Sequence, residues 1–320
     1  MGNVTVTAPA KAILVGEHFV VAGCPAIALA LDIRAKATAE LLNEDVIEIV
    51  SKEFGIRRYG GKETRVEDPL YPVYLVVKEV LKLAGSNQGL KVVIESNIPP
   101  AAGLGSSAAV AVATASAVAK LLGLNASLEE ITRTAYTGEV EIHKKPSGID
   151  NTVSAYGGAI YFSIGKGFER LDVNFSQVRL VLADSGIQRS TGTLVARVLA
   201  LKSKHSSVLD QVYAAATVLV ENTRDALERE DFTAVGELMN INHGLLSAIG
   251  VSNAKLEELI YTARQAGALG AKITGAGGGG MILALCWRED AEQIAMELSK
   301  ASTKVLMTSV SEKGVTLESG

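Results

Sequence analysis

The chain has 320 residues, of which 48% are hydrophobic, and its formal net charge is −4. This length predicts about two domains, and the mildly acidic charge argues against a general nucleic-acid-binding protein. Cys24 and Cys286, the two cysteines, indicate neither a disulfide framework nor a zinc site. No signal peptide is visible, and the longest apolar stretch, 108–119, is too short to cross a bilayer. We therefore expect a cytoplasmic protein with no membrane or nucleic-acid partner.

The first half of the chain predicts strands with a few helices. Helical spacing of apolar residues indicates a helix at 72–83, and small residues fill a second helix at 106–122. Ser127 and Glu130 form a capping box that begins a third helix, which runs to about residue 143. Extended segments are expected at 4–8, 11–15, 26–37, 90–96 and 158–163.

The second half begins with a clear strand at 178–184. Helices are then predicted at 191–202, 207–228, 232–248 and 253–266, followed by strands at 271–274 and 280–286, a helix at 289–299 and a strand at 304–310. This order predicts a split β-α-β arrangement on an antiparallel sheet. We place a domain boundary near residue 177, which gives an α+β protein with domains 1–177 and 178–320.

The turn before the helix at 106–122 is the most informative motif. Pro99 and Pro100 end an extended run, and Gly103 and Gly105 then allow a tight turn. The helix start that follows has unpaired N–H donors and the positive end of the helix dipole, so it forms a cradle for an anion such as phosphate. The motif is neither a Walker A loop nor a dinucleotide fingerprint. The alternative is a simple tight turn into a buried helix.

A second glycine cluster lies at 275–280 and precedes a strand, so it is not a dinucleotide fingerprint either. Five glycines in six positions are costly in chain entropy, which favours a loop that packs closely on another backbone or on a ligand. A hairpin turn is the alternative.

Two further segments contain charged residues. Lys11 lies in an apolar segment that continues to Glu17 and His18. A strand lysine that reaches solvent explains Lys11 equally well, and a surface turn explains Glu17 and His18 equally well. Glu139 lies in a predicted helix, and the turn after it presents Asp150. A carboxylate in that position is usually a cap for the next helix.

Together these four pieces resemble the GHMP family of small-molecule kinases. Residues 9–18 are similar to its first motif, 99–109 to its second, phosphate-binding motif, and 272–280 to its third. Segments 16–23, 145–151 and 184–196 are most similar to the members that phosphorylate mevalonate, in their short archaeal form. The resemblance covers nearly the whole chain. It implies a two-domain fold with a ribosomal-protein-S5-like N-terminal domain and a ferredoxin-like C-terminal domain.

The resemblance also implies an activity, which is ATP-dependent phosphorylation of the 5-hydroxyl of (R)-mevalonate in isoprenoid biosynthesis, with ATP and Mg²⁺ as cofactors. Asp150 would accept the proton of the hydroxyl, and Lys11 would stabilise charge on the developing alkoxide. Ser107 and Glu139 would bind the metal. The ATP phosphates would bind along Ala101, Ala102, Gly103, Leu104, Gly105, Ser106 and Ser107. The mevalonate pocket would include Glu17, His18, Ser147, Asp150 and Thr191, and Gly275, Gly277 and Gly278 would support the site.

Three alternatives stay open. A phosphomevalonate kinase would need additional basic residues in the pocket, for which the acceptor region offers Lys11, Lys144, Lys145 and Arg189. Mevalonate diphosphate decarboxylase shares the family fold. A catalytically silent sensor of ATP and a metabolite is the third alternative, although such proteins usually lack the base or a metal ligand.

The resemblance also implies a homodimer. The adenine pocket has no residue-level prediction beyond the region 60–75.

Overall fold

The computed structural model describes residues 2–60, 68–100, 102–143, 147–188 and 191–318. Its larger sheet has the strand order β12-β1-β2-β5-β3-β4, and β6 pairs with both β2 and β7. The pairs are antiparallel except for β3 with β5. The strands are β1 (Val4–Val15), β2 (Ala26–Leu41), β3 (Ile47–Ser51), β4 (Gly55–Tyr59), β5 (Leu90–Ser96), β6 (Ala159–Ser163), β7 (Gly167–Leu171) and β12 (Thr316–Leu317).

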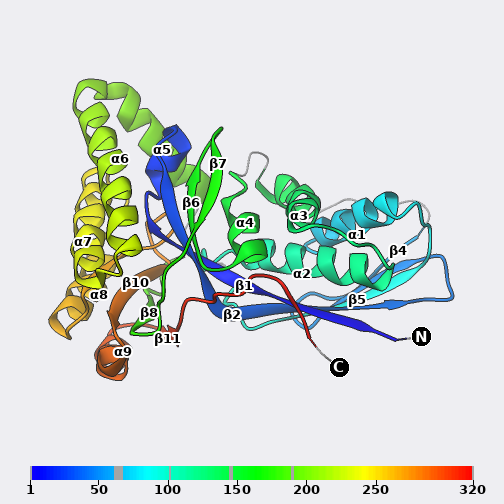
Figure 1. The fold of residues 1–320 in the computed structure, drawn as a ribbon. Coiled ribbons are helices and arrows are strands. Elements are labelled where there is room, and N and C mark those ends of the chain that lie inside the picture. The colour runs from blue at the N-terminus through cyan, green and yellow to red at the C-terminus, as the bar shows by residue number, and fades with distance from the viewer. Residues whose placement is uncertain (1, 61–67, 101, 144–146, 189–190, 319–320) are drawn as a thin grey trace.

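Helices α1 (Tyr71–Leu83), α2 (Ser106–Leu121), α3 (Leu128–His143) and α4 (Ile149–Tyr156) lie along one side of the long strands β1 and β2 (Figure 1). Helix α2 is central, because it contacts both strands and all three neighbouring helices. Nearly all of its side chains from Ala108 to Ala119 are buried. This confirms the prediction that the helix of small residues lies inside the fold, where small side chains allow close packing on every face.

The second sheet is antiparallel, with the order β11-β8-β10-β9. Its strands are β8 (Val178–Asp184), β9 (Gly270–Ile273), β10 (Met281–Trp287) and β11 (Lys304–Thr308), and its helices are α5 (Thr191–Lys204), α6 (Ser206–Glu228), α7 (Phe232–Ala248), α8 (Ala254–Gln265) and α9 (Ala291–Ser299). Two short 3-10 helices, η1 (His18–Ala22) and η2 (Arg288–Asp290), complete the described elements. Among the described helices, none is both long and apolar enough to cross a membrane.

Several elements differ from the sequence-based expectation. The two segments predicted at 4–8 and 11–15 form one strand, β1, whose register against β2 shifts between Pro9 and Ala10. The shift fits a proline, which has no N–H for the ladder. Strands β4 and β7 were not predicted, because only the last residue of each is buried and no apolar alternation results. Strand β3 was not predicted either, although Ile47, Glu48 and Ile49 alternate between apolar and charged residues and the strand alternates between buried and partly buried positions.

The capping box is confirmed at the start of α3. The backbone N–H of Ser127 donates to Glu130 Oε2 at 2.8 Å, and the N–H of Glu130 donates to Ser127 Oγ at 3.2 Å. Both groups would otherwise lack a partner in the helix.

The chain leaves the second sheet after β11. Strand β12 pairs with β1, and Val310 forms a bridge with Leu31 of β2. The last described residues therefore extend the first sheet, although they follow the second in sequence. The division into 1–177 and 178–320 stays a prediction.

Candidate active site

Lys11 and Asp150 form an ion pair within the first layer, which consists of the larger sheet and helices α1 to α4. Lys11 lies in β1, and Asp150 lies in the first turn of α4, which begins after Gly148 with its φ of +83°. Lys11 Nζ is 3.2 Å from Asp150 Oδ1, and the lysine is 5% exposed whereas the aspartate side chain is 30% exposed. The helix α4 was not predicted. It explains the position of the carboxylate, because the positive end of a helix dipole favours an acidic side chain in the first turn.

The glycine turn before α2 contacts this ion pair directly. The N–H of Lys11 donates to the carbonyl oxygen of Leu104 at 2.9 Å, and Lys11 Nζ donates to that of Gly103 at 3.5 Å. A Cβ atom at Gly105, whose φ is +69°, would lie 2.8 Å from Lys11 Cγ and 3.5 Å from Asp150 Oδ2. The helix start that the sequence predicts as an anion cradle and the carboxylate of Asp150 thus lie next to each other.

The residues predicted to hold the ATP phosphates lie around this turn. Ala102 and Leu104 are buried, and Ser106 and Ser107 begin α2. Ala101 lies outside the described residues.

A cavity of about 730 Å³ opens at the start of α2. Ser106 and Ser107 line it on one side, and Glu139 of α3, which is 2% exposed, lines it on another. A hydroxyl and a carboxylate are ligands suited to Mg²⁺. Apolar side chains from the start of α1 and from α2 and α3 form a further wall, with Leu70, Val73, Val110 and Ile142 among them. Leu70 and Val73 of this wall lie in the region 60–75, which the sequence analysis named for the adenine pocket without assigning residues.

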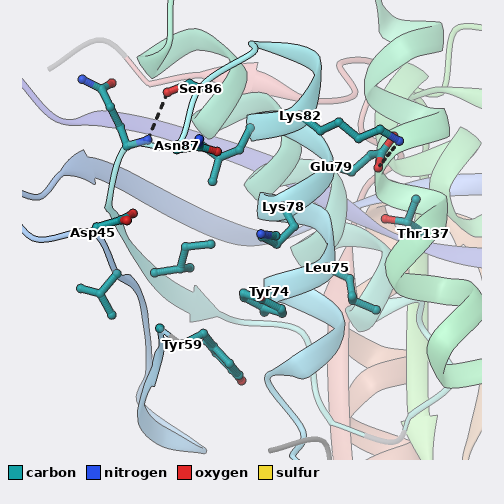
Figure 2. A pocket seen from close by; sticks show the side chains of 15 residues that line it. Asp45, Tyr59, Tyr74, Leu75, Lys78, Glu79, Lys82, Ser86, Asn87 and Thr137 are labelled. Carbon is teal, nitrogen blue, oxygen red and sulfur yellow. Dashed lines mark hydrogen bonds and ion pairs between the residues drawn. The ribbon is translucent and has the colours of Figure 1, made fainter. Parts of the chain in front are cut away.

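A second cavity of about 760 Å³ lies beside α1 (Figure 2). Its lining comes from α1, from the loop after it, from the strands β3 and β4, and from Thr137 of α3. Lys82 in this lining pairs with Glu79 at 3.6 Å, as the dashed line in Figure 2 shows. None of the residues predicted for catalysis or for binding phosphate, metal or mevalonate lines it, although Gly60, Tyr74 and Leu75 of the region 60–75 do. The helix start of α2 therefore opens into the first cavity and not into this one.

Glu17 and His18, both predicted for the mevalonate pocket, are buried and contact the second layer, which consists of the second sheet and helices α5 to α9. Glu17 Oε1 forms an ion pair with Lys272 of β9, and Glu17 Oε2 accepts a hydrogen bond from Asn242 Nδ2 at 2.9 Å. His18 Nε2 donates to the carbonyl oxygen of Ala276 at 2.8 Å. The carboxylate of Glu17 is thus held by protein groups at both oxygens.

The glycine loop at 275–280 connects β9 to β10 and packs on other backbone segments. A Cβ atom at Gly277 would lie 2.3 Å from the carbonyl oxygen of Val251, and one at Gly279 would lie 2.3 Å from that of Ile187. Gly275, Gly277 and Gly278 all have positive φ. The close backbone approach anticipated from the glycine count is therefore present.

Ser147 and Thr191 are the other two residues predicted for the acceptor pocket. Ser147 is exposed and precedes Gly148, after which α4 begins, and its Oγ accepts from the N–H of Ile149 at 3.5 Å. Thr191 begins α5, but its side chain lies outside the described part of the chain, as do Lys144, Lys145 and Arg189.

Lys272 and Asn242 had no predicted role. Lys272 has no exposed surface, and burial lowers the pKa of its ammonium group against the raising effect of Glu17. The signal was the same as for Lys11, because both are lysines in otherwise apolar strands. Asn242, in the middle of a helix, carried no such signal.

Comparisons with known proteins show the family to which the chain belongs. The family model described as "GHMP kinases N terminal domain" matches residues 72–158, and "GHMP kinases C terminal" matches residues 223–303. The chain is 42% identical to the mevalonate kinase of Pyrococcus furiosus over 99% of its own length and 98% of that protein. It is 33% identical to the mevalonate kinase of Aeropyrum pernix, with 98% and 97% covered.

Solved structures give the same result. The mevalonate kinase of Methanococcus jannaschii superimposes with a TM-score of 0.86 at 26% identity, covering 97% of this chain and 98% of the other. The L. major mevalonate kinase in complex with R-mevalonate gives 0.82 at 30% identity, covering 95% and 94%. The predicted α+β GHMP kinase fold is confirmed. The chain belongs to the GHMP kinase family and, within it, to the mevalonate kinases.

Proposed function

We propose that the chain transfers the γ-phosphoryl group of ATP to the 5-hydroxyl of (R)-mevalonate, which yields ADP and mevalonate 5-phosphate. The observation that carries this proposal is the contact between the Lys11–Asp150 pair and the glycine turn at the start of α2. A helix start suited to phosphate and a carboxylate suited to an acceptor hydroxyl meet there. The similarity to mevalonate kinases over nearly the full chain supports the choice of acceptor.

Asp150 is the group that takes the proton of the acceptor hydroxyl. Its carboxylate is partly exposed, so a substrate can reach it, and the buried ammonium of Lys11 lies 3.2 Å away. That ammonium stabilises negative charge on the acceptor oxygen as the proton leaves. Phosphoryl transfer depends mainly on positioning and charge neutralisation, which these two groups and the backbone of the turn supply.

Ser107 and Glu139 would hold Mg²⁺ at the edge of the 730 Å³ cavity. When bound, the ion neutralises phosphate charge. The described residues contain no cluster of three or more His, Cys, Asp or Glu side chains suited to a metal. The two oxygen ligands fit Mg²⁺ nevertheless, because this ion commonly uses one or two side chains and completes its shell with water and substrate phosphate.

The acceptor side would be formed by His18, Ser147 and Thr191 around the carboxylate and the 3-hydroxyl of mevalonate. His18 is fixed by its hydrogen bond to Ala276, which supports a role in orienting the substrate. We also propose that the enzyme is cytoplasmic and forms a homodimer.

A coupled assay of ADP release tests the function. Mevalonate, mevalonate 5-phosphate, homoserine and galactose are offered in turn with Mg²⁺ and again with EDTA. Of the four acceptors, we expect only mevalonate to give ADP release, and we expect EDTA to abolish that release. Turnover with mevalonate 5-phosphate instead would indicate a phosphomevalonate kinase, and calorimetric binding of ATP and mevalonate without ADP release would indicate a sensor.

A further inference from the structure

A lysine with no exposed surface joins the two layers near the proposed acceptor site. Lys272 lies in β9 of the second sheet, and its ammonium forms an ion pair with Glu17, which follows β1 of the first sheet. The same ammonium donates to the carbonyl oxygen of Ile13 in β1 at 3.4 Å and to that of Ile273 in its own strand. An ammonium has three protons, and each has an acceptor here.

Asn242 of α7 completes the network from another direction. Its Nδ2 donates to Glu17 Oε2 at 2.9 Å, and its Oδ1 accepts from the N–H of Gly16 at 3.3 Å. Asn242 is fully buried and Glu17 is 4% exposed. A buried charge of this kind is tolerated only when its partners are well placed. The turn at Gly16 and Glu17 is therefore held by directional bonds to two elements of the second layer.

The groups next to this network belong to the proposed site. Ile13 follows Lys11 by two residues in the same strand, and its carbonyl oxygen also accepts from Thr274 Oγ1 at 3.3 Å. His18 directly follows Glu17 and donates to Ala276 in the glycine loop. A shift of the Lys272–Glu17 pair would move the strand that presents Lys11 and the histidine together.

We infer that the Lys272–Glu17–Asn242 network positions the phosphoryl acceptor, which deepens the proposed function and rests on it. Lys272 and Glu17 are positioning residues: they act through β1 and His18, and they set where these groups lie relative to the loop 275–280. Replacing a buried ion pair by neutral groups of similar size often leaves stability unchanged. Removing the directional bonds nevertheless lets Lys11 and His18 shift. Such a shift slows the reaction, because a misplacement of about 1 Å costs roughly 100-fold in rate.

Three variants separate positioning from stability: Lys272→Met, Glu17→Gln and the double variant. Each single variant leaves one buried charge without its partner, so its melting temperature falls by roughly 5–15 °C. The double variant removes both charges and regains most of that loss. We expect kcat/KM for mevalonate to stay about 10- to 100-fold below the parent in the double variant, while KM for ATP stays within about threefold.

The matched control is the exposed ion pair Lys255–Glu258 on α8, with its atoms 3.0 Å apart. The double variant Lys255→Met with Glu258→Gln should change neither kinetic constant. Recovery of both melting temperature and kcat/KM in the Lys272→Met, Glu17→Gln double variant would overturn the inference, because it would show a role in stability alone. An equal loss of affinity for ATP and mevalonate would overturn it as well.

Asn242→Ala supplies a milder probe if the buried-pair variants fail to fold. It removes the hydrogen bonds of the Asn242 side chain with Glu17 and Gly16 and leaves the Lys272–Glu17 ion pair in place. We expect a smaller loss in kcat/KM for mevalonate with an unchanged KM for ATP. No loss in kcat/KM would overturn the inference. The parent enzyme is the reference throughout. A parent that does not phosphorylate mevalonate refutes the proposed function, whereas an active parent with unaffected variants refutes the inference alone.

Discussion

Asp150 and Lys11 are 139 positions apart in the chain and meet because β1 and α4 pack side by side. Each residue had an ordinary explanation in the sequence, as a helix cap and as a strand lysine that reaches solvent. The structure gives Lys11 a buried position and a carboxylate partner, and it places the glycine turn against both. Proximity of this kind depends on the tertiary fold, so local patterns alone did not predict it, whereas the resemblance to a known family did.

Replacement of Asp150 by Asn tests the proposed base at the residue scale. The amide keeps the size of the side chain but cannot take a proton, so turnover should fall by about 10²–10⁴-fold. ATP binding, measured by isothermal titration calorimetry, should persist because the phosphate-binding turn is unchanged. Turnover within about threefold of the parent would remove Asp150 from this role.

Replacement of Gly105 by Ala tests the contact between the turn and the ion pair. The added Cβ would lie 2.8 Å from Lys11 Cγ, so the turn or the lysine must move. We expect turnover to fall by about 100-fold or more. Gly85→Ala is the matched control, because Gly85 also has a positive φ and its added Cβ would meet nothing within 4 Å. Turnover in Gly105→Ala as high as in Gly85→Ala would show that the contact between the turn and Lys11 does not matter for catalysis.

At the scale of elements, α2 shows what the sequence predicted best. Its small residues, its glycine turn and its place at a cavity all follow from local chemistry, and the structure confirms them. Strands β4 and β7 were missed because pairing in a hairpin, rather than an apolar pattern, sets their conformation. Helix α4 was missed because its eight residues are too few for a periodic signal.

The junction of α7 and α8 predicts a dependence of stability on pH. His243 of α7 is buried, and its Nε2 lies 3.0 Å from Glu257 Oε2 of α8. Burial lowers the pKa of His243 below its usual value of 6.5, against the raising effect of the hydrogen bond to Glu257. The unfolded chain therefore binds more protons just below pH 6.5, and stability is lost as the pH falls through that range.

Melting temperatures at pH 7.5 and pH 5.5 measure this contribution. The decrease between the two should be smaller in His243→Gln than in the parent, since the variant has no imidazole to protonate on unfolding. His205→Gln, which alters an exposed histidine, should keep the decrease of the parent. A decrease in His243→Gln as large as that of the parent would contradict the assignment.

At the scale of the whole molecule, three motifs far apart in the sequence gather where the two layers meet. The segment 9–18 contacts the glycine turn through Lys11 and the loop 275–280 through His18. The order of the motifs indicated the family, but the bonds that hold them together involve Lys272 and Asn242, to which the sequence assigned no role. A buried polar network of this kind becomes visible only when the partners are in place.

The ³¹P NMR spectrum of the products formed from ATP and (R)-mevalonate with Mg²⁺ tests the proposed phosphoryl transfer most directly. We expect a phosphomonoester coupled to the protons of carbon 5, formed in equal amount with ADP. Inorganic phosphate in place of that ester, or an unchanged ATP spectrum, would contradict the claim that Asp150 and the glycine turn together direct phosphoryl transfer to the acceptor alcohol.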